Sequence, residues 1–266
     1  SFDVVIVGGG ITGAAVGYGL AKRGVKTCLV DAVPTFSRAS RANMGLIWCQ
    51  SKALGCPQFV RWGFASSRAY GKLAAELKEL SGIDTGYAPT GGIIPCLGEA
   101  ELEARAQFIE KLRAETEDGT YPASVLSRKE LEGMLPKVPF GPEVSGGIWS
   151  DMDGYVDPLH LMFAFRKSFV RLGGTLFAGE RVSEVKPSGK GYAVVCGGRT
   201  LECGKAVLAA GLGVRKLAAQ LGTDIPVFPN KSLVMLLERI PADVLPIPLL
   251  GIARTFGGTV MIGAAH

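Results

Sequence analysis

A glycine-rich turn directly after the first apolar run constrains the fold more than any other feature. The chain opens "FDVVIVGGGITGAAVGYGLAKRGVKTCLVD". Residues 4–7 are continuously apolar, as expected for a strand buried on both faces of a parallel sheet. Gly8-x-Gly10-x-x-Gly13 follows, small residues at 11–23 have a helical pattern, and a second apolar run at 25–30 ends on an acid. This order predicts a strand–helix–strand unit.

The same turn predicts a dinucleotide site. The first glycine allows the sharp turn, the second lets a diphosphate approach the backbone, and the third lets helix and strand pack closely. The acid that ends the second strand is placed to accept a hydrogen bond from a ribose hydroxyl, and it disfavours the 2′-phosphate of NADP. NAD and FAD both remain open, and a plain surface carboxylate is the alternative for the acid. The predicted site comprises Gly8, Gly10, Ile11, Thr12, Gly13 and Asp31.

Composition limits the other function classes. The 29 basic and 24 acidic residues of this 266-residue chain are scattered, so a nucleic-acid partner is not expected. Only two histidines and six cysteines without a CxxC pair occur, so we expect no metal or iron–sulfur site in this chain. No apolar run is long enough for a membrane span or a signal peptide, which predicts a cytoplasmic protein.

Further helices and strands are expected along the chain. Apolar residues at helical spacing predict helices at 58–80, 99–117, 158–172 and 214–221. Ser127 and Glu130 have the spacing of a capping box, and residues 175–209 read as a set of strands.

Several segments resemble a known family, in its order and over nearly the whole chain. "SRASRANMGLIW", "GYVDPLHLMFAFRKSFVRLGG", "ERVSEV" and "KAVLAAGLGVRKLA" resemble the D-amino-acid oxidase, glycine oxidase and sarcosine oxidase (DAO) superfamily of FAD enzymes. Within it, "SRANMGLIWCQSK", "RWGFASSRAY" and "TGGIIPC" are most similar to the B subunits of bacterial opine (octopine/nopaline) oxidases. Flavin subunits of hydrogen cyanide synthases and hydroxyproline dehydrogenases are also similar. The resemblance favours FAD over NAD.

The resemblance implies an α/β (α+β) fold in which a Rossmann-like FAD-binding domain is interleaved with a smaller antiparallel-sheet substrate domain. We expect residues 1–84 and 146–222 in the FAD-binding domain, and residues 85–145 and 223–266 in the substrate domain. Members of the family continue beyond the equivalent of His266 and return a glycine-rich segment to the flavin, so we expect that part of the fold to be missing from this sequence.

The resemblance also implies further cofactor contacts. The loop after the second strand would lie along the diphosphate and the flavin ring, Val182 would offer its backbone to the adenine, and an Ala-Ala-Gly segment would pass beside the nucleotide. An arginine of the loop could neutralise phosphate; a solvated loop charge is the alternative for each arginine, and sheet core is the alternative for Val182. These residues are Arg38, Ser40, Arg41, Asn43, Met44, Gly45, Val182, Ala209, Ala210 and Gly211.

The implied reaction removes a hydride from a carbon that bears an amine, and water then hydrolyses the resulting imine. Arg254 is the candidate to bind a substrate carboxylate bidentately, with a structural or exposed arginine as the alternative. Lys52 is a second catalytic candidate that could tune the flavin or meet substrate, although a solvated lysine is the simpler reading. His160 is expected to be structural.

The implied protein is an FAD-dependent amine oxidoreductase that acts on an opine. Companion subunits would carry a second flavin and an iron–sulfur centre, and they could bring the protein to the inner membrane. Alternatives are a stand-alone oxidase or dehydrogenase for glycine, sarcosine or D-amino acids, a hydrogen cyanide synthase-like subunit, or a non-catalytic FAD-binding subunit. An NAD-dependent dehydrogenase is disfavoured, because the long loop after Asp31 and the late "AVLAAG" segment would have no role in it.

Overall fold

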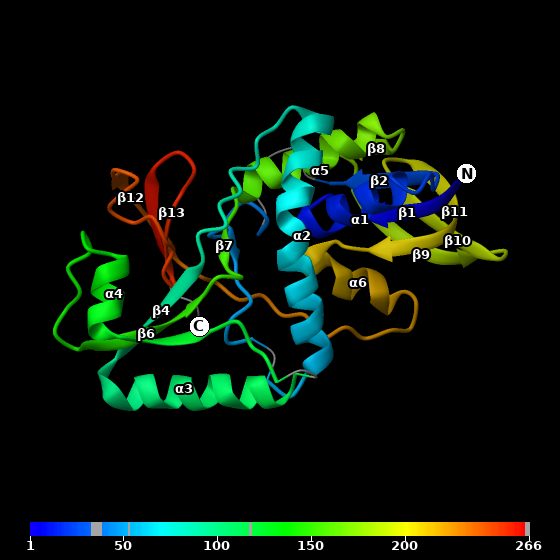
Figure 1. The fold of residues 1–266 in the computed structure, drawn as a ribbon. Coiled ribbons are helices and arrows are strands. Elements are labelled where there is room, and N and C mark those ends of the chain that lie inside the picture. The colour runs from blue at the N-terminus through cyan, green and yellow to red at the C-terminus, as the bar shows by residue number, and fades with distance from the viewer. Residues whose placement is uncertain (33–38, 53, 117–118, 264–266) are drawn as a thin grey trace. The chain divides into compact units, whose positions relative to one another are not determined.

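The computed structural model describes residues 1–32, 39–52, 54–116 and 119–263. Its helices are α1 (Ile11–Ala21), α2 (Pro57–Ser81), α3 (Gly98–Ala114), α4 (Arg128–Met134), α5 (Pro158–Arg171), α6 (Val214–Ala219) and the 3-10 turn η1 (Gly211–Gly213) (Figure 1). Its strands are β1 (Phe2–Val7), β2 (Thr27–Asp31), β3 (Leu46–Ile47), β4 (Gly92–Leu97), β5 (Ser124–Ser127), β6 (Val144–Ser150), β7 (Gly154–Tyr155), β8 (Thr175–Ala178), β9 (Val182–Ser188), β10 (Gly191–Cys196), β11 (Arg199–Leu208), β12 (Val234–Arg239), β13 (Ile252–Arg254) and β14 (Thr259–Gly263).

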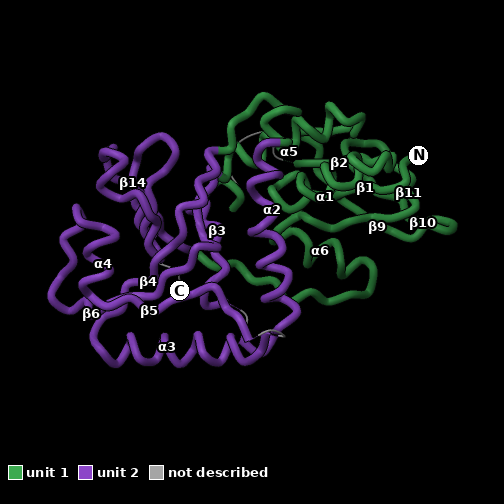
Figure 2. The backbone as a smooth tube through the Cα atoms, in the orientation of Figure 1, with its two compact units in different colours: residues 1–43, 76–85, 158–231 green, residues 44–75, 86–157, 232–266 purple. Residues whose placement is uncertain are grey.

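The chain forms two compact units, each built from three segments. The first contains residues 1–43, 76–85 and 158–231, and the second contains residues 44–75, 86–157 and 232–266 (Figure 2). Interleaving is thus a property of the fold, but the segment bounds differ from those of the predicted domains. Residues 44–75 and 146–157 belong to the second unit, because β3 pairs with β7 and β6 is the middle strand between β4 and β5.

The first unit is built on a six-stranded sheet in the order β8-β2-β1-β11-β10-β9. The first four strands are parallel, and β10 and β9 continue the sheet antiparallel. Successive side chains of a strand point to opposite faces. Val4 and Ile6 therefore pack toward Phe169 on one face, whereas Val5 and Val7 pack toward Leu217 on the other. The continuous apolar run at residues 4–7 is confirmed as the part of this strand that is buried on both faces.

Helices α1 and α5 pack against each other in the first unit (Figure 1). The rings of Tyr18 and Phe165 lie 5.5 Å apart between them. A Cβ on Gly17 would come within 3.2 Å of the Phe169 ring, so the small residues of α1 allow this close approach. The predicted strand–helix–strand unit and the helix beginning at Pro158 are both confirmed.

The second unit is antiparallel. Its sheets have the orders β4-β6-β5, β12-β14-β13 and β3-β7. One core lies between β4, β6, α3 and the first part of α2, and another contains Leu131, Leu135, Leu249 and Val260. Ser127 and Glu130 form the predicted capping box at the start of α4.

Candidate functional site

The glycine turn between β1 and α1 is packed so tightly that side chains are excluded. Gly8 has φ +104°, and a Cβ there would lie 2.4 Å from the Ala209 carbonyl oxygen. A Cβ on Gly13 would lie 1.8 Å from the Gly8 carbonyl oxygen. The Ala209 amide donates to Val7 O at 2.8 Å, which fixes the Ala-Ala-Gly segment beside the turn. The structure therefore brings Gly8, Ala209 and Ala210 together.

The beginning of α1 fits a dinucleotide diphosphate. Gly10 is the N-cap and provides no side-chain cap, and the first turn contains no acidic residue. The Ile11 amide donates to Ser40 Oγ at 2.9 Å, so Ser40 of the following loop lies at this helix end. The side-chain amide of Asn43 donates to Ser40 O at 2.9 Å and holds the loop there. The positive end of a helix dipole attracts anions.

Asp31 lies beside the same turn. It is 5% exposed, and a Cβ on Gly9 would come within 2.4 Å of its Oδ2. Its main-chain oxygen accepts from the amides of Gly179 and Glu180 at 2.7 and 3.0 Å. These bonds hold the end of β2, so the carboxylate is directed toward the glycine turn, as a ribose-binding acid requires.

Arg166 is a residue of this region that the sequence reasoning missed. It lies on α5, and its Nη1 is 3.7 Å from Asp31 Oδ2. Its side chain is 11% exposed. The only available signal was a basic residue among the apolar positions of the 158–172 helix, which by itself does not identify a partner.

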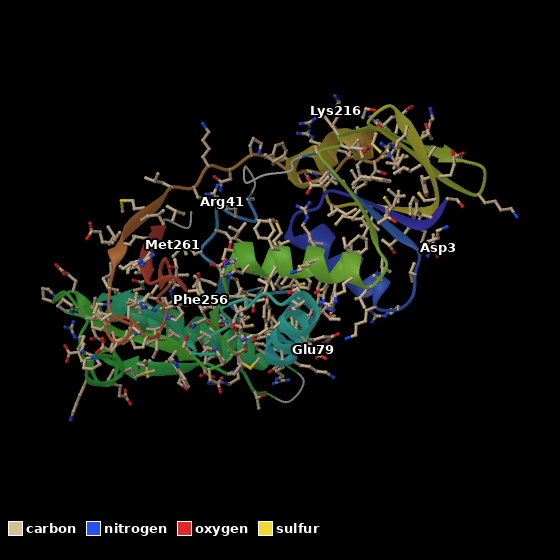
Figure 3. All side chains as sticks on the ribbon, turned by 90° about the horizontal axis from the view of Figure 1, so that it is seen from above. Asp3, Arg41, Glu79, Lys216, Phe256 and Met261 are labelled. Atoms are coloured by element: carbon tan, nitrogen blue, oxygen red, sulfur yellow. The ribbon has the colours of Figure 1, made fainter. Side chains whose placement is uncertain are left out.

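The other predicted cofactor residues divide between the units. Ser40, Arg41 and Asn43 belong to the first unit, and Arg41 is exposed (Figure 3). Met44 and Gly45 belong to the second. In the first unit, Val182 begins β9 and packs partly buried against the sheet core, while Gly211 opens η1. Arg38 lies outside the described residues. The cofactor roles of all these residues stay predictions.

A buried carboxylate in the second unit was also missed. Asp153, 2% exposed, accepts hydrogen bonds from the Cys49 amide at 2.5 Å and from Gln50 Nε2 at 2.7 Å. Gln50 Nε2 also donates to Gly92 O at 2.8 Å. Burial raises the pKa of Asp153 to about 6, although these hydrogen bonds and the charge of Lys52 oppose the rise. The signal in the sequence was a pair of acids in an otherwise apolar and glycine-rich stretch.

The segment that Asp153 holds contains further buried polar atoms. Gln50 Oε1 and Ser51 Oγ are buried and have no hydrogen-bond partner within the described ranges. Ser51 has φ +57°, a left-handed conformation that is costly for a residue other than glycine. Tyr121 Oη donates to Cys49 O at 3.0 Å. Unpaired polar atoms and local strain cluster at functional segments, which draws attention to residues 49–52.

The two predicted catalytic residues occupy different settings in the second unit. Lys52 is exposed and follows directly on the strained segment. Arg254 is half-buried on β13; its Nε donates to Ile240 O at 3.1 Å, and its Nη2 lies beside Gly258. One edge of this guanidinium is thus bound to the protein's own backbone. Catalytic roles for both residues stay predictions.

The cysteines and the potential metal ligands of the described residues are the groups that a thiol or metal site would need. All six cysteines are free, and burial raises the pKa of Cys28 to about 12 and that of Cys96 to about 11. Such thiols are protonated and poor nucleophiles. Within residues 1–32, 39–52, 54–116 and 119–263, no group of three or more potential metal ligands is found, and no helix has the length and apolarity to cross a membrane.

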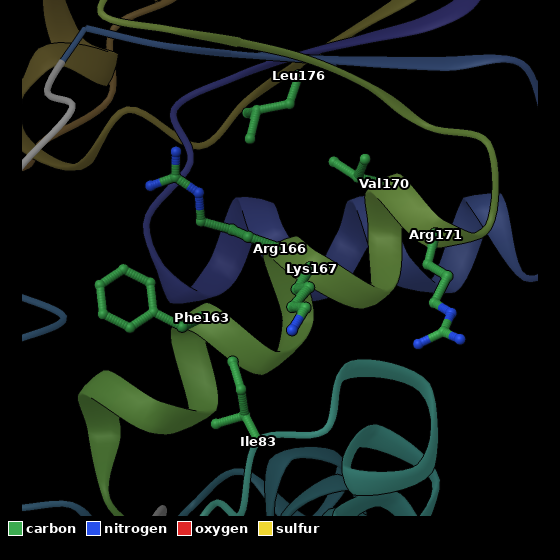
Figure 4. A pocket seen from close by; sticks show the side chains of 7 residues that line it. All are labelled: Ile83, Phe163, Arg166, Lys167, Val170, Arg171 and Leu176. Carbon is green, nitrogen blue, oxygen red and sulfur yellow. The ribbon is translucent and has the colours of Figure 1, made fainter.

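One pocket of about 600 Å³ lies on the first unit, over α5 and β8. Its walls are mainly apolar, with basic side chains among them (Figure 4). The lining residues are Ile83, Phe163, Arg166, Lys167, Val170, Arg171 and Leu176.

Comparison with known proteins identifies the family. A family model described as FAD dependent oxidoreductase (DAO) matches residues 3–266. The opine oxidase B subunit of Agrobacterium tumefaciens (strain Ach5) is 34% identical over 98% of this chain and 70% of that protein. Glycine oxidase of Geobacillus kaustophilus (strain HTA426) is 28% identical over 94% of this chain and 63% of that protein.

Solved structures agree with these matches. The crystal structure of glycine oxidase from Geobacillus kaustophilus has a TM-score of 0.89 at 26% identity, over 99% of this chain and 71% of that one. An FAD-bound α-glycerophosphate oxidase from Mycoplasma pneumoniae has the same fold, with a TM-score of 0.79 at 18% identity over 98% of this chain and 70% of that one. The predicted resemblance and fold class are confirmed. The chain belongs to the DAO family of FAD-dependent oxidoreductases, and FAD is its cofactor.

Proposed function

We propose that this protein oxidises the C–N bond of an opine, a secondary amine derived from an amino acid, such as octopine or nopaline. The observation that carries the proposal is the 34% and 33% identity to two opine oxidase B subunits, each over 98% of this chain. Bound FAD would supply the acceptor for a hydride from the carbon that bears the amine; with loss of the amine proton this would give an imine, and its hydrolysis would release an amino acid and a 2-oxo acid.

The residues of the chain have binding and orienting roles in this proposal. The glycine turn and the beginning of α1 bind the diphosphate, and Asp31 accepts a hydrogen bond from the adenosine ribose. Arg254 binds a substrate carboxylate through the guanidinium edge that does not face Ile240, which fixes the reacting carbon. Lys52 contributes a positive charge beside the strained segment. No strong protein base is required if the amine is neutral when the hydride leaves.

Oxidation of a simple amino acid is the second candidate. It is favoured by the fold match to glycine oxidase, with a TM-score of 0.89. Anaerobic addition of octopine, nopaline, glycine, sarcosine and D-alanine to the flavin-loaded protein separates the two. We expect the visible absorbance of the oxidised flavin to be lost with an opine. Loss with glycine, sarcosine or D-alanine alone would refute the opine proposal in favour of the second candidate.

Arg254→Ala tests the carboxylate role. We expect a KM for the opine raised at least about tenfold, because a bidentate charge-assisted contact is removed. Arg239→Ala is the matched control, since Arg239 is an exposed arginine at the end of β12, in the same sheet as β13. Equal effects of the two substitutions would remove Arg254 from the substrate site.

Companion proteins are part of the proposal. Several relatives are themselves named as subunits, among them those of opine oxidase and of hydrogen cyanide synthase, which supports a hetero-oligomer. A second flavin and an iron–sulfur centre would then lie in other chains. Isolation of the native complex, with its masses and visible spectrum, tests this, and a preparation without companions would contradict it. The cytoplasmic location stays a prediction.

A further inference from the structure

Arg166 and the buried Asp31 form an ion pair of low exposure next to the nucleotide turn. Their closest charged atoms are 3.7 Å apart, and their side chains are 11% and 6% exposed. The arginine extends from α5 away from the ends of Lys167 and Arg171, its neighbours in the pocket (Figure 4). The guanidinium is therefore directed toward Asp31 and away from the other two basic side chains of the pocket.

The position of the Asp31 carboxylate opposes binding of the negatively charged diphosphate of FAD. Asp31 Oδ2 lies against Gly9, inside the turn that binds the diphosphate. A carboxylate and a diphosphate are both negative, and their repulsion grows where water is excluded. A cation beside the carboxylate offsets this repulsion. A guanidinium suits the role, because it stays charged under all ordinary conditions.

We propose that Arg166 is a positioning residue for FAD: it holds the Asp31 carboxylate toward the ribose and compensates its charge when the diphosphate binds. The proposal rests on the predicted ribose contact of Asp31. A purely structural ion pair would stabilise the fold but would leave the dissociation constant of FAD unchanged when the arginine is replaced. A positioning role predicts that the same replacement raises this dissociation constant.

A double-mutant cycle on FAD affinity tests the proposal. The variants are Arg166→Met, Arg166→Lys, Asp31→Asn, Asp31→Ala and the double variant Asp31→Asn/Arg166→Met. Each is purified with FAD, stripped of it, and titrated with FAD by flavin fluorescence. We expect Arg166→Met to raise the Kd roughly tenfold, a coupling of the size seen for contacting charged residues. Arg166→Lys should retain most of the affinity, and Arg166→Met should change the Kd less than about twofold in the Asp31→Asn background.

Lys167→Met is the matched control. Lys167 is the next residue of α5, is exposed, and lines the same pocket, so its replacement should leave the Kd unchanged. The proposal is overturned if Arg166→Met leaves the Kd unchanged, if its effect is the same with and without Asp31, or if Lys167→Met has an equal effect.

The variants distinguish a wrong role of Arg166 from two other outcomes, a variant that does not fold and a wrong ribose contact of Asp31. If Arg166→Met does not fold, Arg166→Lys still tests the geometry, and the double variant removes both charges together. If Asp31→Ala, which removes both acceptor oxygens, leaves the Kd unchanged, the predicted ribose contact is wrong. If Asp31→Ala raises the Kd but no Arg166 variant does, the ribose contact stands and the role of Arg166 is wrong.

Discussion

Asp153 should make the stability of this protein depend on pH in a direction opposite to that of most carboxylates. Its pKa is raised from 3.8 to about 6, chiefly by burial. The folded state therefore binds the proton more tightly than the unfolded state. Protonation stabilises the fold fully below the unfolded pKa, and this contribution is lost as pH rises through the folded pKa.

The magnitude follows from the shift. A shift of roughly two pH units, at about 1.4 kcal/mol each, corresponds to about 3 kcal/mol between the two limits. By the linkage relation, about 2 kcal/mol of this appears between pH 7.5 and pH 4.5. The neighbouring Cys49 and Tyr121 do not contribute to this change in the free energy of unfolding. Burial raises their pKa values to about 11 and about 12, well above this pH range.

Asp153→Asn removes the titrating group. Urea unfolding at pH 4.5, 6.0 and 7.5 with excess FAD gives the free energy of unfolding for each protein. We expect the wild type to gain about 2 kcal/mol relative to Asp153→Asn as pH falls from 7.5 to 4.5. Asp151→Asn is the control, since Asp151 is an exposed carboxylate two residues away. Parallel pH profiles for wild type and Asp153→Asn would refute the reasoning.

Three further substitutions, the first with a control, test local structure and packing in the two units. Gly13→Ala should abolish FAD binding, because its Cβ would lie 1.8 Å from Gly8 O, whereas Gly63→Ala has open space on α2 and should leave binding intact; titration with FAD checks both. Phe169→Ala should lower the free energy of unfolding by about 3–5 kcal/mol, because Phe169 is fully buried between sheet and helices; urea unfolding measures it. Ser127→Ala should cost about 1 kcal/mol through loss of the capping box, and an unchanged unfolding midpoint would contradict that.

The nucleotide-binding unit was predictable because its signals are local. Strand, turn, helix and acid follow one another within residues 2–31, so spacing alone predicts their contacts. The prediction also placed the Ala-Ala-Gly segment beside the nucleotide, and the structure holds Ala209 against Gly8. That contact came from the family resemblance, because nothing in the spacing joins residues some two hundred positions apart.

The segment bounds of the two compact units are not visible in local sequence signals, and the predicted domain bounds stay a prediction. Residues 44–75 lie in sequence between the first two segments of the nucleotide-binding unit, yet they belong to the second unit, where β3 pairs with β7. β3 and β7 pair over only two residues each, which is too short for the alternation of apolar and polar residues that identifies a strand in a sequence. The apolar pattern predicted a helix at 58–80, within one residue of α2 at either end. It did not predict that residues up to 75 belong to the second unit and the rest of the helix to the first.

Arg166 and Asp153 share the physical reason for having been missed. Each is a charged residue with a second charge close to it in sequence, and such a residue is interpreted as a surface position until its partner is known. Arg166 meets an acid from β2, and Asp153 meets backbone amides from residues 49 and 50. A buried charge must be paired or hydrogen-bonded, so a charged residue inside a predicted buried face implies an unseen partner. That rule predicts that a partner exists, and only the fold says which one.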